Sequence, residues 1–342
     1  MTEIETSTKS GALTSEALVS KHELASNQVD LVAQKLKACG EGLRVQALQC
    51  LRSDAFGVLE LTQIFDTKQS GMSHHLKVLS KAGLVEAQRE GNSIFYRRPV
   101  QRQRGLEFLV VTQLFAILDA LPVHPDIERR MRVIREQRAI QSQAFFNKNS
   151  DLFSAQQELI CNHEQYAQTS FDLLKAGLAD ARSRVLEIGP GEGNFLKLLG
   201  SYYKDVVAVD TSEQMLAKAD KLCTNNDIRN VQLMLGEATA LADQDERFDG
   251  IVMNMVLHHI PAPARIFNDC ARLLSKGGVL VICDLSHHDQ EWTKENCGDA
   301  WLGFETAELT TWAEAANFHE DESVFIGLRN GFQIQLHRYI KQ

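Results

Sequence analysis

A glycine loop between an apolar run and a helical pattern constrains this chain more than any other feature. Residues 186–195 read LEIGPGEGNF, and Gly189, Gly191 and Gly193 alternate directly after the apolar pair Val185–Leu186. Glycine permits backbone conformations and close approaches that a side chain would prevent. The order of strand, glycine turn and helix therefore predicts a ligand held against the backbone of a βα unit. The loop begins beyond the middle of 342 residues, so the first half of the chain needs its own account.

The residues after 184 alternate between strand-like and helix-like segments. This alternation predicts an α/β fold with a doubly wound, mostly parallel sheet, and a ligand site at the carboxyl ends of the first strands. The expected strands cover 184–189, 205–210, 231–238, 248–257 and 278–285, and the expected helices cover 193–203, 212–223 and 264–277.

The spacing of the glycines separates two classes of cofactor. Dinucleotide-binding loops favour G-x-G-x-x-G, whereas this loop reads G-x-G-x-G after Glu187. The second expected strand, VVAVD, ends in Asp210 and is followed by TSEQML. These motifs, in this order, resemble the class I S-adenosylmethionine-dependent methyltransferases. The resemblance implies a Rossmann-like fold that binds S-adenosylmethionine or S-adenosylhomocysteine.

The resemblance also implies roles for particular residues. The glycines would approach the amino-acid part of the cofactor, and Asp210 would accept hydrogen bonds from both ribose hydroxyls. Glu187 would orient the loop or meet the ammonium group through water. Glu237, where the family more often has aspartate, would contact the adenine amine, and Met215 would line the adenine pocket or belong to the core. The implied cofactor-binding residues are Glu187, Gly189, Gly191, Gly193, Asp210, Met215, Glu237, Ala238 and Asn254.

The methyl acceptor and the catalytic residues stay open. Methyl transfer is an in-line displacement in which positioning supplies much of the rate, so no general base is obligatory. His258 and His259, in NMVLHHI, follow a strand on the ligand side and are weak catalytic candidates, because a structural role explains each histidine better. Arsenite is a disfavoured acceptor, since no adjacent pair occurs among Cys223, Cys270, Cys283 and Cys297.

A second pattern lies in the first half of the chain. Residues 58–65 predict a short helix, 66–68 a turn, and 69–81 a second helix, which ends before Gly83. The alternating stretch LVEAQREGNSIFYRR predicts a β-hairpin. This order is that of a winged helix-turn-helix. Residues 29–104 resemble the ArsR/SmtB family of bacterial repressors, most clearly in SGMSHHLKVLSKAGLVEAQREGNSIFYR. The resemblance implies a dimer that places each second helix in a DNA major groove.

The charge distribution agrees with a DNA-binding module. The chain carries a net charge of −9, yet residues 68–104 hold eight basic and two acidic side chains. Polar side chains can read base edges, and basic ones can neutralise phosphates. No metal site is expected, because the first helix lacks the paired cysteines of metal-sensing members and adjacent histidines project apart. The expected DNA-binding residues are Gln69, Ser70, Ser73, His74, His75, Lys77, Arg89 and Arg97, with Asn92 and Ser93 also in the wing.

These patterns predict four regions: a disordered tail (1–28), the winged helix-turn-helix domain (29–104), dimerisation and connector helices (105–180), and the methyltransferase domain (181–342). Within the connector, 126 to about 175 is expected to be helical. No run of 18 apolar residues occurs, and the first residues lack the apolar core of a signal peptide, so a cytoplasmic protein without a membrane span is expected.

Two functions follow from this organisation. In the first, the protein is a transcriptional regulator, and the cofactor state biases the binding of a homodimer to operator DNA. In the second, it is a small-molecule methyltransferase with an accessory DNA-binding module. A third hypothesis, a second domain that serves assembly alone, is disfavoured by the near-complete cofactor pattern. The sequence leaves open whether the methyltransferase domain turns over.

Overall fold

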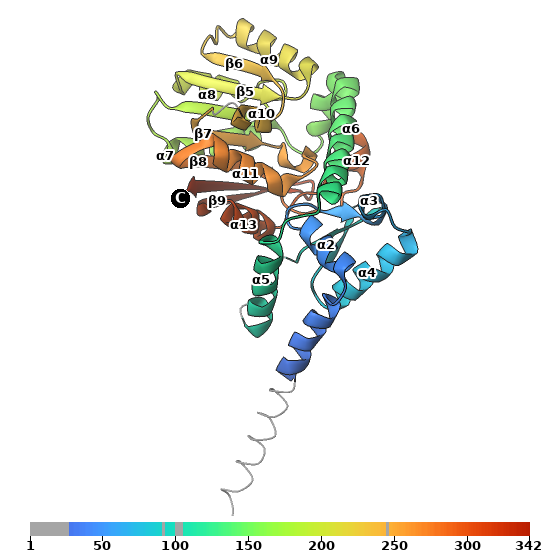
Figure 1. Ribbon diagram of the computed structural model, residues 1–342. Coiled ribbons are helices and arrows are strands. Elements are labelled where there is room, and N and C mark those ends of the chain that lie inside the picture. Colours follow the sequence, from blue (N-terminus) through green and yellow to red (C-terminus); the bar gives the residue numbers. More distant parts are fainter. Residues whose placement is uncertain (1–26, 91–92, 100–104, 244–245) are drawn as a thin grey trace, which may run out of the picture. The chain divides into compact units, whose positions relative to one another are not determined.

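The computed structural model describes residues 27–90, 93–99, 105–243 and 246–342 (Figure 1). Residues 1–26 of the expected tail lie outside the described residues. Two compact units are present, and the predicted division into four regions stays a prediction. Unit 1 comprises residues up to Arg52, Phe56–Gln88 and Phe95–Glu128, and unit 2 comprises Ser53–Ala55, Arg89–Ile94 and Arg129–Gln342.

The helices of unit 1 share a small apolar core. Helix α3 begins where the backbone N–H of Gly57 donates to Glu60 Oε2 (2.7 Å), and it ends at Asp66, which takes a left-handed conformation (φ 50°). Leu61 and Leu76, from neighbouring helices, are fully buried. The two predicted helices have the bounds that their apolar spacing indicates. Residues 27–38 are helical, and the helices that follow are α2 (Gly42–Cys50), α3 (Val58–Phe65), α4 (Gln69–Lys81) and α5 (Leu106–Asp119).

A β-hairpin follows the two helices, as the alternating stretch predicts, and a short strand that precedes both helices extends it to a three-stranded sheet. Its order is β1-β3-β2, and Phe56 of β1 lies opposite Tyr96 of β3 in an antiparallel pair. Asn92 lies outside the described residues. Helices α3 and α4 followed by this hairpin form the predicted winged helix-turn-helix. The strands are β1 (Phe56–Gly57), β2 (Glu86–Glu90) and β3 (Ser93–Arg97).

The expected helix from 126 to about 175 is not continuous, which corrects the sequence interpretation. Helix α6 (Pro125–Gln157) stops because Ile160 and Cys161 are drawn into the apolar core, where they are nearly fully buried. A new start follows, in which the backbone N–H of Asn162 donates to Gln165 Oε1 (2.7 Å). It leads into the short helix η1 (His163–Gln165) and then α7 (Ala167–Gly177).

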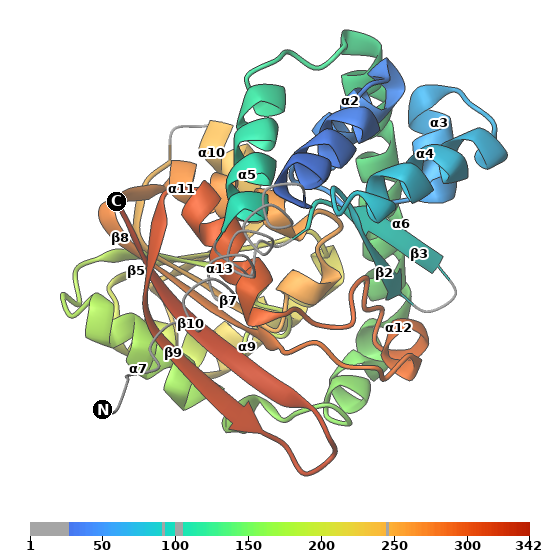
Figure 2. The ribbon, with the colours of Figure 1, turned by 90° about the horizontal axis from the view of Figure 1, so that it is seen from below.

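Unit 2 is built on a seven-stranded sheet of order β6-β5-β4-β7-β8-β10-β9. Strands β4 to β8 are parallel neighbours, which confirms the predicted doubly wound arrangement. The antiparallel pair β9–β10 extends this sheet beyond β8 and was not predicted (Figure 2). The strands are β4 (Arg184–Ile188), β5 (Asp205–Asp210), β6 (Val231–Leu235), β7 (Phe248–Asn254), β8 (Leu274–Leu285), β9 (Phe318–Gly327) and β10 (Gln333–Lys341).

Helices cover both faces of this sheet (Figure 1). The central strands are buried along their length, so they read as continuous apolar runs. No helix among the described residues is long and apolar enough to cross a membrane. The helices are α8 (Leu196–Tyr202), α9 (Glu213–Asn225), α10 (Ala238–Asp243), η2 (Leu257–His259), α11 (Pro263–Leu273), α12 (Trp292–Asn296) and α13 (Thr306–Ala315).

Candidate functional site

Unit 2 contains a cavity of about 850 Å³ at the carboxyl ends of β4, β5 and β7. This is the edge of a parallel sheet where ligands bind in open α/β folds. Gly193 does not line the cavity, because it packs against Ala219 of α9. A Cβ added at Gly193 would lie 3.0 Å from the Cβ of Ala219. Eight of the nine expected cofactor residues line it: Glu187, Gly189, Gly191, Asp210, Met215, Glu237, Ala238 and Asn254.

Two glycines of the loop serve different needs. Gly189 has φ +69°, and a Cβ there would lie 2.6 Å from Cγ2 of Val256, so both backbone and packing require glycine. Gly191 also has a left-handed backbone (φ +54°), but a Cβ there would meet no described atom within 4 Å. The space beside Gly191 belongs to the cavity, and the loop therefore offers bare backbone to a ligand.

Asp210 ties the glycine loop to the strand and to the next helix. Its Oδ2 accepts from the backbone N–H of Gly191 (3.3 Å), and its Oδ1 accepts from that of Ser212 (2.8 Å). The Ser212 hydroxyl in turn accepts from the N–H of Met215 and caps α9. Burial raises the pKa of Asp210, while these backbone hydrogen bonds oppose the rise. The carboxylate is thus held at the cavity wall before any ligand arrives.

Glu187 is a buried carboxyl group beside that carboxylate. It is 2% exposed, and among the described residues its Oε2 has no hydrogen-bond partner. Burial, followed by the negative charge of Asp210, raises the pKa of Glu187 to about 8. An unpartnered carboxyl on a cavity wall is a position for a cationic or hydrogen-bond-donating ligand group, because binding would remove the cost of leaving it unpaired.

Asn254 ends β7 and presents its amide at the same wall. Its Oδ1 accepts from the hydroxyl of Ser170 on α7 (2.6 Å), and its Nδ2 has no partner among the described residues. The following residue, Met255, has φ +57°, and its N–H donates to Cys283 O (2.7 Å). The hydrogen bond from Ser170 holds the Asn254 side chain in place. No local pattern identifies Ser170, which lies 84 residues earlier in the chain.

Helix α6 supplies a second wall that sequence reasoning did not assign to the site. Its residues in unit 2 stand beside the carboxyl edge of the sheet (Figure 1). Gln143 Nε2 donates to Thr211 O (2.7 Å), and the ring of Phe146 lies 4.9 Å from that of His259. The sequence indicated only that this segment is helical, and a helical pattern does not identify the surface against which the helix packs. The α6 residues that line the cavity are Arg135, Glu136, Ala139, Ile140, Ser142, Gln143 and Phe146.

The two weak catalytic candidates, His258 and His259, lie on η2 in contrasting environments. His258 Nδ1 donates to Asp284 Oδ1 (2.8 Å). Burial lowers the pKa of His258, but the negative charges of Asp284 and Asp299 outweigh it and raise the pKa to about 9. Burial and the positive charge of His258 hold the pKa of His259 well below its usual value. Of the two, His259 lines the cavity, so a neutral imidazole faces the ligand space.

The expected DNA-reading helix, α4, has two distinct faces. Met72, Leu76 and Leu79 are fully buried. The opposite face presents polar and basic side chains to solvent, as a helix that enters a groove must. The exposed residues of that face are Gln69, Ser70, Ser73, His74 and Lys77.

Three other expected DNA contacts differ in accessibility. The His75 side chain is 16% exposed, and its Nδ1 lies 3.4 Å from Glu41 Oε2. The Arg97 side chain is also 16% exposed, and it lies 3.7 Å from Glu86 Oε2. Arg89 is exposed. Of these, Arg89 is the most exposed, and all three assignments stay predictions.

Comparison with known families agrees with both halves of this architecture. Residues 42–87 match the family model described as a bacterial regulatory protein of the arsR family. Residues 186–282 match the model of a methyltransferase domain. The chain joins an arsR-family domain to a methyltransferase domain. The winged helix-turn-helix and the Rossmann-like methyltransferase fold predicted from sequence are therefore confirmed.

Individual relatives match the methyltransferase half. An uncharacterised methyltransferase, YcgJ of Bacillus subtilis, is 27% identical over 139 residues, which are 40% of this chain and 54% of that protein. An arsenite methyltransferase of Halobacterium salinarum is 33% identical over 104 residues, 30% of this chain and 27% of that protein. The crystal structure of YcgJ superposes with a TM-score of 0.44 at 17% identity, covering 51% of this chain and 99% of the other. The chain thus spans about half or less of these curated relatives' length.

Proposed function

We propose that the cavity of the methyltransferase domain binds S-adenosylmethionine or S-adenosylhomocysteine. The observation that carries this proposal is the arrangement of Asp210 and Gly191: a carboxylate at the end of β5, held by the N–H of a bare glycine loop, beside a cavity. A carboxylate so placed suits a ribose diol, and the bare backbone suits the amino-acid part of the cofactor. The unpartnered Glu187 adds a site for the ammonium group, which both cofactor forms carry.

Isothermal titration of the full chain with each cofactor form tests this proposal. Asp210→Ala should abolish binding of both, because it removes the ribose partner. Asp205→Ala is a matched control: this aspartate begins the same strand, at the end away from the cavity. Unchanged affinity in Asp210→Ala would remove the ribose assignment, and equal losses in the two variants would indicate general damage to β5.

The second part of the proposal is regulatory: the arsR-family domain binds operator DNA as a homodimer, and the cofactor form in the cavity biases that binding. Its support is the presence of both modules in one chain, together with the exposed polar face of α4. Coupling between two sites is typically worth about 1–3 kcal/mol, or roughly 5- to 150-fold in affinity.

Fluorescence anisotropy on the DNA upstream of the protein's own gene tests the regulatory part. Measurements without ligand, with S-adenosylmethionine and with S-adenosylhomocysteine should give different DNA affinities. Tight binding that is indifferent to both ligands would uncouple the two modules. Sedimentation of the protein with and without DNA tests the homodimer in the same samples.

An alternative function is methyl transfer to a small molecule, with the DNA-binding module accessory. One observation supports this alternative: residues outside the expected cofactor set, including Ile260 and Arg265, also line the cavity. Its volume is near the upper end of the roughly 300–1,000 Å³ typical of small-molecule sites, which leaves room for an acceptor beside a cofactor. Release of S-adenosylhomocysteine that depends on an added metabolite fraction would support this alternative, and its absence in every fraction would favour the regulatory function.

A further inference from the structure

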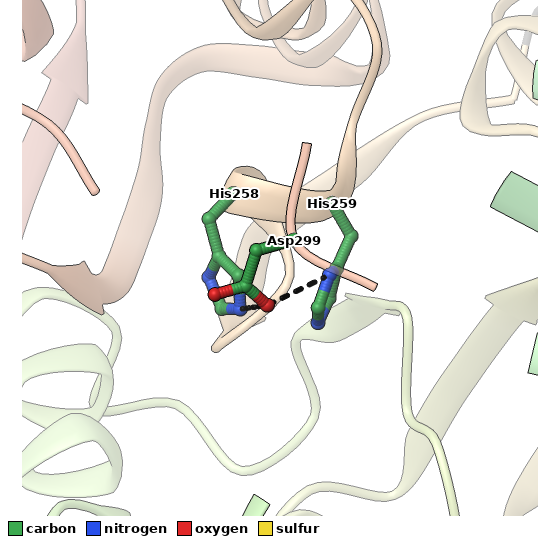
Figure 3. Close-up of side chains that lie close together, drawn as sticks. All are labelled: His258, His259 and Asp299. Atoms are coloured by element: carbon green, nitrogen blue, oxygen red, sulfur yellow. Dashed lines mark ion pairs between the residues drawn. The ribbon is translucent and has the colours of Figure 1, made fainter. Parts of the chain in front are cut away.

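Three metal-ligating side chains converge next to the cavity, from segments far apart in the sequence. His258 and His259 come from η2, and Asp299 comes from the loop after α12 (Figure 3). One potential ligand atom from each lies within 4.8 Å of the other two. All three residues are buried, so this cluster differs from the acidic groups that gather on a solvated surface.

The spacing of these atoms is close to that of a filled coordination sphere. His258 Nε2 and Asp299 Oδ1 are 3.7 Å apart, and His259 Nδ1 and the same oxygen are 3.6 Å apart. Ligands at about 2.1 Å from a tetrahedral zinc ion lie about 3.4 Å from each other. The two distances to the Asp299 oxygen are within a few tenths of an ångström of this value, and the ligand atoms of the two histidines lie within 4.8 Å of each other.

The Asp299 carboxylate is buried without a hydrogen bond to any described residue, and the ring of His258 is a charged neighbour 3.7 Å away. Its side chain is fully buried, and neither oxygen has a hydrogen-bond partner among the described residues. The hydroxyl of Thr293 also interacts with this carboxylate, but its hydrogen bond is donated to Gln290 O (3.1 Å). Neither histidine ring lies within hydrogen-bonding distance of Asp299, as the separations above show. The His258 imidazolium compensates part of the charge of this buried carboxylate, and a metal ion that replaces the proton on His258 Nε2 would compensate more of it.

The environment of His258 suits a ligand role. Its Nδ1 donates to Asp284, whose other oxygen accepts from the backbone N–H of Leu257 (2.8 Å). A carboxylate that holds one ring nitrogen and leaves the other toward the ion is the usual support of a metal-bound histidine. For His259, binding through Nδ1 would replace its long hydrogen bond to Gly298 O (3.3 Å).

We propose that His258, His259 and Asp299 form a binding site for a divalent transition-metal ion of the zinc type, with Asp284 as the positioning residue for His258. Two imidazoles and one carboxylate are a ligand set of catalytic zinc sites, which keep a fourth position open. Because His259 lines the cavity, an open position would be reached from the ligand space. If the proposed methyl-transfer function holds, that position would take an oxygen, nitrogen or sulfur atom of the acceptor.

Cobalt(II) titration of the chelator-stripped full-length protein tests the site without cofactor or acceptor, so its outcome is separate from that of the proposed function. The expected result is one equivalent of Co²⁺ with the intense visible absorption of a four-coordinate ion, displaced by Zn²⁺. Asp299→Asn and His259→Ala should each remove this spectrum. The matched control is His163→Ala, a cavity-lining histidine outside the cluster, which should leave it unchanged.

Folding of each variant is monitored by thermal unfolding, because Asp299→Asn removes a buried charge and should keep the protein folded. The proposal is overturned if the wild-type protein gives no four-coordinate spectrum. It is equally overturned if folded Asp299→Asn and His259→Ala bind Co²⁺ as the wild type does.

Discussion

At the scale of single residues, the most telling group is Glu187. Its neighbour Asp210 is satisfied by two backbone N–H groups, whereas Glu187 Oε2 has no partner among the described residues. The pKa of Glu187 is raised to about 8, so this carboxyl is largely protonated at neutral pH, whereas burial raises the pKa of Asp210 against the opposing effect of its backbone hydrogen bonds. A cation that binds beside Glu187 must displace the proton of this carboxyl.

This difference predicts proton release on cofactor binding. Near pH 7, binding of S-adenosylmethionine should release up to about one proton from Glu187, which appears as a binding enthalpy that depends on the ionisation enthalpy of the buffer. Glu187→Gln should remove the Glu187 contribution and weaken binding about tenfold or more, because a charge-assisted contact worth roughly 1.5–3 kcal/mol is lost. Identical buffer dependence in wild type and variant would contradict the role given to Glu187.

The same group predicts how stability varies with pH without ligand. The folded pKa of about 8 lies above the ordinary value of 4.5, so the folded state binds the extra proton between them. Its stabilising contribution is complete below about pH 4.5 and is lost as the pH rises through 8. Glu187→Gln should therefore become more stable relative to wild type as the pH rises across this window, as measured by thermal unfolding. A constant difference between the two would contradict the raised pKa.

The environment of the paired histidines could not be predicted from sequence. Asp284 lies 26 residues after His258 and is read from sequence as the end of a buried strand. Asp299 lies in a segment without helical or strand periodicity. Contacts between such distant positions depend on how β8 packs beside η2. The spacing of residues along the sequence does not indicate this packing. The motifs that were found, such as the glycine loop, are local in sequence.

At the scale of elements, the glycine loop contains one glycine required for packing, Gly189, and one that faces the cavity, Gly191. Gly189→Ala would force a Cβ to within 2.6 Å of Val256, in a left-handed conformation. Gly191→Ala has the same backbone cost of about 1–2 kcal/mol but no described neighbour to displace. Gly189→Ala should therefore destabilise the protein more, while Gly191→Ala should weaken cofactor binding beyond its effect on stability. Denaturant unfolding and cofactor titration of both variants check this, and equal losses of stability would contradict the packing argument.

Helix α4 allows a comparable test on DNA. Lys77 is exposed on the face opposite the buried stripe, so Lys77→Ala should weaken operator binding and reduce the salt slope by about 0.9 if it contacts one phosphate. Lys221→Ala, an exposed lysine on α9, is the control and should change neither. A salt slope unchanged in Lys77→Ala would remove this residue from the phosphate contacts.

The elements predicted correctly are those whose pattern is local. Helices α3 and α4 have strong apolar stripes between clear turns, and strands β4 and β5 are buried and mostly apolar. The β9–β10 pair was missed because β9 carries several charged residues on solvent-facing positions and therefore lacks an apolar pattern. The end of α6 was missed because the polar residues around it continue a helical composition, while the core position of Ile160 is set by tertiary packing.

At the scale of the whole molecule, the proposed regulation has a reciprocal consequence. If a cofactor changes DNA affinity by some factor, saturating DNA must change the affinity for that cofactor by the same factor. Titrating S-adenosylmethionine and S-adenosylhomocysteine with and without operator DNA measures this. In Lys77→Ala, the effect of a fixed sub-saturating DNA concentration should shrink, while cofactor affinity without DNA stays unchanged. If the cofactor changes DNA affinity by a different factor from that by which DNA changes cofactor affinity, the measured changes do not arise from thermodynamic linkage between the two binding sites.

The outermost strands of the seven-stranded sheet also bear on how the protein behaves when concentrated. Strand β6 ends one side after only five residues, and β9 ends the other with Glu320, Asp321 and Glu322 in sequence. Unpaired strand edges are templates for aggregation, and short length or adjacent charges are the usual protection. Salt screens such charges. The protection of the ten-residue β9 edge therefore depends on ionic strength more than the protection of the β6 edge does. Storage at high salt would therefore favour precipitation through this edge.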